Sequence, residues 1–537
     1  MKLIFRKIWT AAAIVLLAMP LAANNITVSN VAITARDDAN KFIEVTFNIT
    51  WENSFRTVGL SPNNWDAAWV FMKFNKTNSY SAFDHCKLDA VANHSLPDAD
   101  NYEFVQPADS MGVFIQRKTP GSGTVTLNGC KLRWKYSGSA SFDPTNPIDV
   151  KVFALEMVYV PTGAFKVGSG GAESGAFGTG ASLSTPFPIT SEASLSINNA
   201  AGALWGSSSS GNNTIGAVGT LPAEFPKGYQ GFYCMKYELT QKAYVDFLNS
   251  LSRRQQNYRT NLWWRNANGN GGIMGNNPSY YDGTWYYNFR YVMSIDQASR
   301  NYQNGIRCLD NFATRPAPIV FANDVNGSVA ADFSSSNQAD DGQQKACGYL
   351  SNASTLAYLD WSGLRPMSEL EYEKACRGNA TPLANEYVWG TTNYVSLTSP
   401  SNNGMVNEVA VNPAANCNVD GNYNAVLRVG MFANPASSRA ESGATFWGIQ
   451  NMGDNLWEPC MSVGLTDNRF FTSTLHGDGK LTVMGATDTG WPNPGMRGGS
   501  AANAVACSRT SDRVNASYVN TSWNVWNYGC RGVRTAP

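Results

Sequence analysis

The pattern of apolar residues changes sharply near residue 154, and this change limits the folds open to the chain. From Ile26 to Ala154, short segments of alternating apolar and polar residues recur between turn residues. Such alternation is typical of half-buried antiparallel strands. The segments are 42–51, 67–74, 112–117, 124–134 and 148–153. They predict an all-β sandwich over residues 24–154.

The remainder, residues 155–537, differs in composition and in the spacing of its apolar residues. Residues 168–220 are rich in Gly and Ser, which predicts a surface excursion. Lys242 to Leu251 has apolar residues at helical spacing, and Ser368 with Glu371 forms a capping box that opens a second helix ended by Gly378. The rest is rich in Asn, Gly and Trp. The overall fold class predicted is therefore α+β.

Charge and composition exclude several classes of protein. The 537 residues include 40 basic and 40 acidic residues, so the formal net charge is zero. This balance argues against nucleic acid or an anionic membrane as the main partner. The chain also contains 16 Trp, 23 Tyr and 25 Phe, enough to build a core and to exclude intrinsic disorder.

The N-terminus resembles a secretory signal peptide. Lys2, Arg6 and Lys7 precede an apolar run, Ile8 to Leu17, which is too short to span a bilayer. We expect residues 1–23 to be removed before Asn24. The mature protein is then exported to the cell surface, the periplasm or the medium, without a transmembrane anchor.

Ten cysteines follow this leader, and none forms a CxxC motif. Export makes disulfides plausible. Cys86 and Cys130 are a natural pair in the first domain, and Cys507 and Cys530 are either a second pair or two buried thiols. Only three histidines are present, which argues against a zinc or iron site built from imidazoles.

Seven blocks of residues 155–537 stand out when taken in order: 156–168, 233–240, 361–378, 387–390, 451–458, 497–500 and 532–534. Together these blocks resemble the formylglycine-generating enzyme (sulfatase-modifying factor) family. This resemblance implies a C-type-lectin-like fold for the second domain.

The chain departs from that family at its catalytic cysteines. The resemblance implies copper-dependent oxidation of a protein cysteine, with two cysteines holding copper(I) shortly after the Arg-Gly-Gly-Ser block. Those positions fall on Asn503 and Ser508, and only Cys507 lies nearby. Ser500 matches the serine of the family. A lone thiolate does not make a copper(I) site, so we expect neither copper nor this activity.

The same resemblance implies a structural calcium site in the loop at 451–458. Its positions are Asn451, Asp454, Leu456 and Glu458, with Asn416 in a second such site. Carboxylate, amide and carbonyl oxygens suit a hard cation. The alternative is hydrogen bonding within a loop rich in Gly and Asn.

The last segment, from Arg497 to Pro537, contains no Lys, Glu, Gln or Met. Its short polar and aromatic residues suit a binding surface. The segment also resembles the variable region of proteins diversified by diversity-generating retroelements, in which Trp523 and Trp526 would be fixed. The alternative is that the segment is an ordinary C-terminus of this family, whose composition reflects ordinary sequence drift. The candidate ligand-binding residues are Asn503, Asn515, Tyr518, Asn520, Trp523, Asn524, Trp526, Asn527 and Tyr528.

The leading hypothesis is an exported, non-catalytic protein that binds a protein or glycan ligand through a surface near 501–528. The first alternative is a formylglycine-generating oxidoreductase with an altered site. The second is a structural component of a bacterial cell-surface or secretion assembly.

Overall fold

A computed structural model describes most of the chain. The described residues are 26–59, 61–137, 142–143, 145–206, 211–260, 263–265, 271–273, 291–294, 301–308, 317–327, 336–434, 436–521 and 525–537. The predicted signal peptide, and the candidates Trp523 and Asn524, lie outside this part of the chain.

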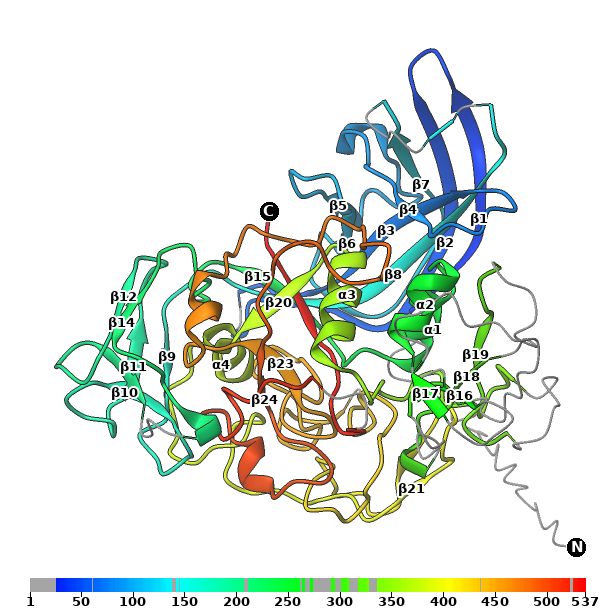
Figure 1. The fold of residues 1–537 in the computed structure, drawn as a ribbon. Coiled ribbons are helices and arrows are strands. Elements are labelled where there is room, and N and C mark those ends of the chain that lie inside the picture. The colour runs from blue at the N-terminus through cyan, green and yellow to red at the C-terminus, as the bar shows by residue number, and fades with distance from the viewer. Residues whose placement is uncertain are drawn as a thin grey trace, which may run out of the picture.

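The N-terminal strands form the predicted sandwich (Figure 1). One sheet has the order β1-β2-β7, with β1 spanning Thr27–Asp37, β2 Phe42–Arg56 and β7 Gly121–Lys135. Burial alternates along β2, so that every second side chain from Ile43 to Trp51 enters the core between the two sheets. This period of two is the pattern on which the prediction rested.

The second sheet of the sandwich continues into the rest of the molecule. Its strand β8, Ile148–Val160, pairs with β3, Asp66–Lys76, on one side and with β15, Phe232–Met235, on the other. The full order is β24-β23-β20-β25-β15-β8-β3-β6-β5. The predicted boundary between residues 154 and 155 therefore lies inside a strand that both parts share.

Strand β3 is buried on both faces, except at its last residue. Val70 and its same-face neighbours pack inside the sandwich, whereas Trp69 and Phe71 join the main core of the second part. Trp69 also donates a hydrogen bond from Nε1 to the Ser362 carbonyl, 2.9 Å away. The two parts thus share one continuous sheet and a packed interface.

The segment 168–220 is more ordered than a Gly/Ser-rich excursion suggests. It contains a small sheet of order β10 (Phe177–Thr179), β13 (Leu204–Gly206), β12 (Leu195–Ile197) and β14 (Gly219–Leu221), in which apolar side chains such as Phe177 and Leu204 are fully buried. Glycine allows this close packing, because a Cβ on Gly168 would lie 1.8 Å from the Phe177 carbonyl oxygen. The segment lies at one side of the molecule (Figure 1).

Four α-helices are described. The two predicted ones are α1, Gln241–Leu248, and α4, Glu369–Arg377, whose capping box between Ser368 and Glu371 is present. The sequence did not indicate the other two, α2 at Arg253–Arg259 and α3 at Asn352–Trp361.

The remaining strands are short. None of the described helices is long and apolar enough to cross a membrane. The strands are β4 Asp84–His85, β5 Tyr102–Val105, β6 Val113–Arg117, β9 Phe165–Val167, β10 Phe177–Thr179, β11 Phe187–Ile189, β12 Leu195–Ile197, β13 Leu204–Gly206, β14 Gly219–Leu221, β16 Trp263–Arg265, β17 Gly271–Ile273, β18 Ile306–Cys308, β19 Phe321–Asn323, β20 Arg365–Ser368, β21 Pro400–Ser401, β22 Val409–Ala410, β23 Glu458–Met461, β24 Gly495–Arg497 and β25 Gly532–Thr535.

All ten cysteines are free thiols, so neither disulfide that the sequence suggested is formed. Cys86 and Cys130 both pack among apolar side chains in the sandwich core. Cys530 belongs to the main core, whereas Cys507 packs at the edge of a different small cluster around Trp457.

Candidate functional site

The Arg-Gly-Gly-Ser block turns the chain from β24 into the C-terminal segment. Gly498 and Gly499 have φ values of +100° and +82°, a region that side chains disfavour. A Cβ on Gly498 would lie 2.6 Å from the Met452 carbonyl oxygen, and one on Gly499 would lie 3.0 Å from the Cβ of Cys507. The two glycines therefore allow the segment to lie close to the 451–458 loop.

Buried ion pairs with helix α4 hold this segment in place. Glu369 accepts from Arg513 at 2.8 Å and from Arg497 at 3.2 Å, and Arg497 also reaches Glu373 at 3.2 Å. Burial alone would raise the pKa of Glu369, but the two guanidinium groups lower it below its usual value. The arginine of the block is thus a structural anchor.

Ser500 and Asn503 lie in a hydrogen-bonded network rather than beside a thiol pair. Ser500 Oγ donates to Asn503 Oδ1 at 2.5 Å, and Trp457 Nε1 donates to the same oxygen at 2.8 Å. Asn527 Nδ2 donates to Ser500 Oγ at 2.8 Å. The structure therefore brings together three of the predicted residues, and adds Trp457 to them.

This arrangement does not fit copper(I). The position expected for the first thiolate is the amide of Asn503, whose oxygen already accepts these hydrogen bonds. Cys507 lies in the short 3-10 helix Val505–Ser508 and is half-buried. Burial raises the pKa of Cys507 to about 12, so its sulfur is a thiol rather than a thiolate near neutral pH.

The predicted calcium loop is rich in oxygen. Asn451 Nδ2 donates to Asp454 Oδ1 at 3.2 Å, and the Asn418 backbone N–H donates to Asp454 Oδ2 at 2.8 Å. Burial raises the pKa of Asp454 to about 6. Leu456 N–H donates to the buried carboxylate of Glu238 at 3.0 Å.

Two buried oxygens of this region lack a hydrogen-bond partner among the described residues, Glu458 Oε2 and Asn418 Oδ1. The other carboxylate oxygen of Glu458 accepts from Arg531 Nε at 2.6 Å. The donor set has the chemistry that calcium requires, and it includes unsatisfied acceptors. By contrast, the Asn416 amide is satisfied at both ends, by the Val395 N–H and the Ala440 carbonyl.

The other predicted ligand-binding residues divide by exposure. Asn515 and Tyr518 are half-buried, and the Tyr518 ring stacks on Tyr528 with centroids 5.9 Å apart. Tyr528 and Asn520 are buried, and Asn520 Nδ2 donates to the Leu350 carbonyl at 3.0 Å. These two residues therefore support the segment from within.

Trp526 is half-buried and stacks on Tyr302 at 4.7 Å. One exposed residue from a distant part of the sequence, Asp420, lies beside the segment, and sequence reasoning missed it. Asp420 accepts from the Val505 N–H at 2.8 Å, and Tyr394 in turn interacts with Asp420. No local motif marks Asp420, because its contact with Val505 joins residues 85 positions apart.

Comparison with known proteins identifies the family. Residues 149–536 match the model of the sulfatase-modifying factor enzyme 1-like domain. The chain belongs to this family, which confirms the resemblance inferred from the seven blocks.

Two solved structures are also similar. PvdO from Pseudomonas aeruginosa is 14% identical with a TM-score of 0.31, and the match covers 71% of this chain and 94% of that one. Variable protein 1 of Treponema denticola is 13% identical with a TM-score of 0.23, covering 71% of this chain and 96% of that one. A search of curated proteins finds no match.

Proposed function

We propose that this chain is an exported, non-catalytic binding protein that uses a sulfatase-modifying-factor scaffold. Its ligand is a protein or a glycan, bound by the C-terminal face, defined as the described residues within 501–521 and 525–528. The leader-like N-terminus supports export, and the loss of the cysteine pair supports the absence of copper chemistry.

The observation that carries this proposal is how the main chain of the C-terminal face is fixed. The Gly421 N–H donates to the Ala501 carbonyl at 2.8 Å, the Ser517 N–H to the Asn212 carbonyl at 2.7 Å, and the Trp457 N–H to the Asn527 carbonyl at 2.9 Å. Such bonds do not depend on the side chains of the segment. These bonds hold the backbone in place independently of its part-exposed side chains, while buried side chains such as Arg513 and Asn520 anchor it from within.

The side chains that remain part-exposed include the amides of Asn503, Asn515 and Asn527 and the ring of Tyr518. Amides adapt their hydrogen bonds to a partner, and a tyrosine supplies contact area at a low entropic cost. A rigid backbone lowers the ordering entropy paid on binding. This combination supports a binding face in which the part-exposed side chains change without loss of the fold.

The test uses the labelled full-length protein on arrays of glycans and extracellular proteins. The double variant Asn515→Ala/Tyr518→Ala should bind its ligand roughly tenfold more weakly, a loss of about 1.4 kcal/mol. The matched control is Asn403→Ala/Tyr80→Ala, an exposed pair elsewhere on the surface. Absence of any ligand, or equal binding by the double variant, would contradict the proposal.

We also propose that the 451–458 loop holds calcium through Asp454. Calcium at one hundred times its Kd should stabilise the folded protein by about 2.7 kcal/mol. Melting curves with calcium, magnesium or a chelator would measure this effect in the wild type and in Asp454→Asn. A calcium effect that is missing from the wild type, or unchanged in the variant, would refute the assignment.

A further inference from the structure

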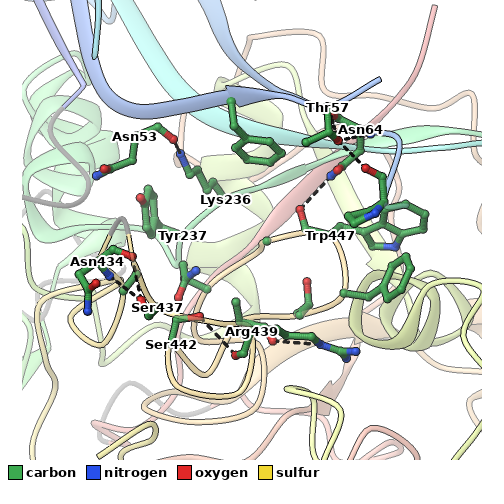
Figure 2. A pocket seen from close by; sticks show the side chains of 18 residues that line it. Asn53, Thr57, Asn64, Lys236, Tyr237, Asn434, Ser437, Arg439, Ser442 and Trp447 are labelled. Carbon is green, nitrogen blue, oxygen red and sulfur yellow. Dashed lines mark hydrogen bonds between the residues drawn. The ribbon is translucent and has the colours of Figure 1, made fainter. Parts of the chain in front are cut away.

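A cavity of about 340 Å³ lies where the sandwich meets the family domain. Asn53, Phe55 and Asn64 line it from the end of β2 and the loop that follows, and residues within 433–434 and 437–450 line it from the other part. Figure 2 shows Tyr237 and Asn434 on one side, with Asn64 and Trp447 across from them. The volume is within the range of small-ligand sites.

Much of the wall is aromatic. Phe55 and Phe446 are half-buried, Trp447 is buried, and all three line the cavity. The rings of Phe446 and Trp447 meet edge to face, with centroids 4.8 Å apart. Rings held in this way offer flat apolar surfaces to a ligand.

The two cations of the lining are already engaged. Lys236 Nζ lies 3.1 Å from Asp66 and 3.2 Å from Glu156, and it donates to the Asn53 carbonyl at 2.9 Å. Arg439 donates to the backbone carbonyls of residues 376 and 388. No carboxylate lines the cavity among the described residues. Carboxylates therefore neutralise Lys236, whereas only neutral carbonyls hold Arg439.

Two polar side chains of the lining make no hydrogen bond to the described part of the chain. They are the Gln450 amide and the Tyr237 hydroxyl, on residues that are 8% and 5% exposed. Neither group is fully enclosed, so both are open to the cavity. A ligand that pairs with both would replace the water hydrogen bonds there, whereas an apolar ligand would not.

We infer that this junction pocket binds a neutral saccharide unit. The C–H face of a sugar ring would pack on the rings of Phe55 and Phe446, and its hydroxyls would donate to and accept from Gln450 and Tyr237. An apolar side chain of a peptide would leave both groups unpaired. An anionic sugar would gain nothing from Lys236, because Asp66 and Glu156 already neutralise that cation.

The site is separate from the proposed function, because no residue of the C-terminal face lines the pocket. Loss of binding at one site therefore leaves the other testable. The sugar is free in solution or is a terminal unit of a glycan, and the two sources share the same ring chemistry.

The experiment measures binding of the full-length protein to neutral monosaccharides by calorimetry and to neutral and sialylated oligosaccharides on an array. The wild type should bind at least one neutral saccharide. Gln450→Met keeps the size of the side chain but removes its amide, and should weaken binding roughly tenfold. Tyr237→Phe provides a second variant that removes only a hydroxyl.

The matched control is Gln230→Met, because Gln230 is exposed and lies outside the pocket. Binding of monosaccharides supports a free sugar, and binding of oligosaccharides alone supports a terminal glycan unit. The inference is overturned if no neutral saccharide binds, if only sialylated glycans bind, or if folded Gln450→Met and Tyr237→Phe bind as the wild type does.

Discussion

Asn503 lies where the family resemblance implies a thiol, and its side-chain oxygen accepts hydrogen bonds from Ser500 and Trp457. An amide at this position cannot serve as a soft anionic ligand. It can, however, fix the positions of the Ser500 hydroxyl and the Trp457 indole N–H, which both donate to it. The chain therefore has a local hydrogen-bonded network at the position where the resemblance implies a metal ligand.

The state of the cysteines gives a prediction at the residue scale. Nine of the ten thiols are buried, and burial raises the pKa of the half-buried Cys507 to about 12. We expect a thiol reagent to modify at most one cysteine in the folded protein and all ten after unfolding without reductant. Fewer than ten reactive thiols in the unfolded protein would reveal a disulfide and contradict the structure.

A second prediction at this scale concerns His94 and acid. Burial lowers the pKa of His94 from 6.5 to about 4, while its Nδ1 accepts from the Arg133 N–H at 3.2 Å. The unfolded chain takes up this proton at a higher pH than the folded protein, so stability is lost as pH falls from 6.5 towards 4.

Denaturant unfolding at several pH values measures this loss. The wild type should lose about 2 kcal/mol more than His94→Asn across the interval. Asparagine is the control because it keeps an acceptor but does not titrate in this range. Equal pH profiles for the two proteins would refute the assignment.

At the scale of elements, the sequence predicted those parts whose pattern is local. Strand β2 alternates because it has one buried face, and α4 carries its own capping box. Helix α3 was missed because all but one of its residues are buried, so it shows no polar face. Helix α2 was missed because its sequence is almost entirely polar.

The candidate site also divides into features with a local sequence pattern, which could be predicted, and contacts between distant segments, which could not. The Arg-Gly-Gly-Ser block and the position of Cys507 could be read from the sequence. The contacts of Asn503 with Trp457, and of Asp420 with Val505, could not, because they join segments far apart in the chain. The junction pocket was also missed, since its walls come from two parts that the sequence presents as separate domains.

Helix α4 gives a prediction at this scale. Glu369→Gln would leave the buried guanidinium groups of Arg497 and Arg513 with one charged partner fewer. Loss of one partner of a buried pair costs about 3–5 kcal/mol, so the free energy of unfolding should fall by that amount. Denaturant titration provides the measurement.

The control for this prediction is an exposed pair. Asp246 lies 2.6 Å from Lys242 on helix α1, with side chains that are 39% and 47% exposed. Asp246→Asn should change the unfolding free energy by about 0.5 kcal/mol or less. A loss in Glu369→Gln no larger than in this control would show that the buried pairs are not anchors.

At the scale of the whole molecule, one sheet runs through both parts. Strand β8 joins them, and Trp69 of the sandwich packs into the core of the family domain. The sandwich therefore completes the fold of the family domain, and also supplies one wall of the junction pocket.

This arrangement predicts a single unfolding transition for the full-length protein. A chain that begins at Asp149 would lack β3 and would expose the edge of β8. We expect calorimetry to show no native-like transition for that shortened chain, and Trp69→Ala in the full chain to cost about 3–5 kcal/mol. Two separate transitions, or a stable shortened chain, would contradict the shared core.

The most direct test of the central claim, that this family member binds without catalysing, is a copper(I) titration coupled to turnover of a cysteine-containing peptide of the sulfatase type. Our account predicts no stoichiometric copper binding and no aldehyde product, in the wild type as in Cys507→Ser. Tight binding of one copper ion together with aldehyde formation, both abolished in Cys507→Ser, would contradict it.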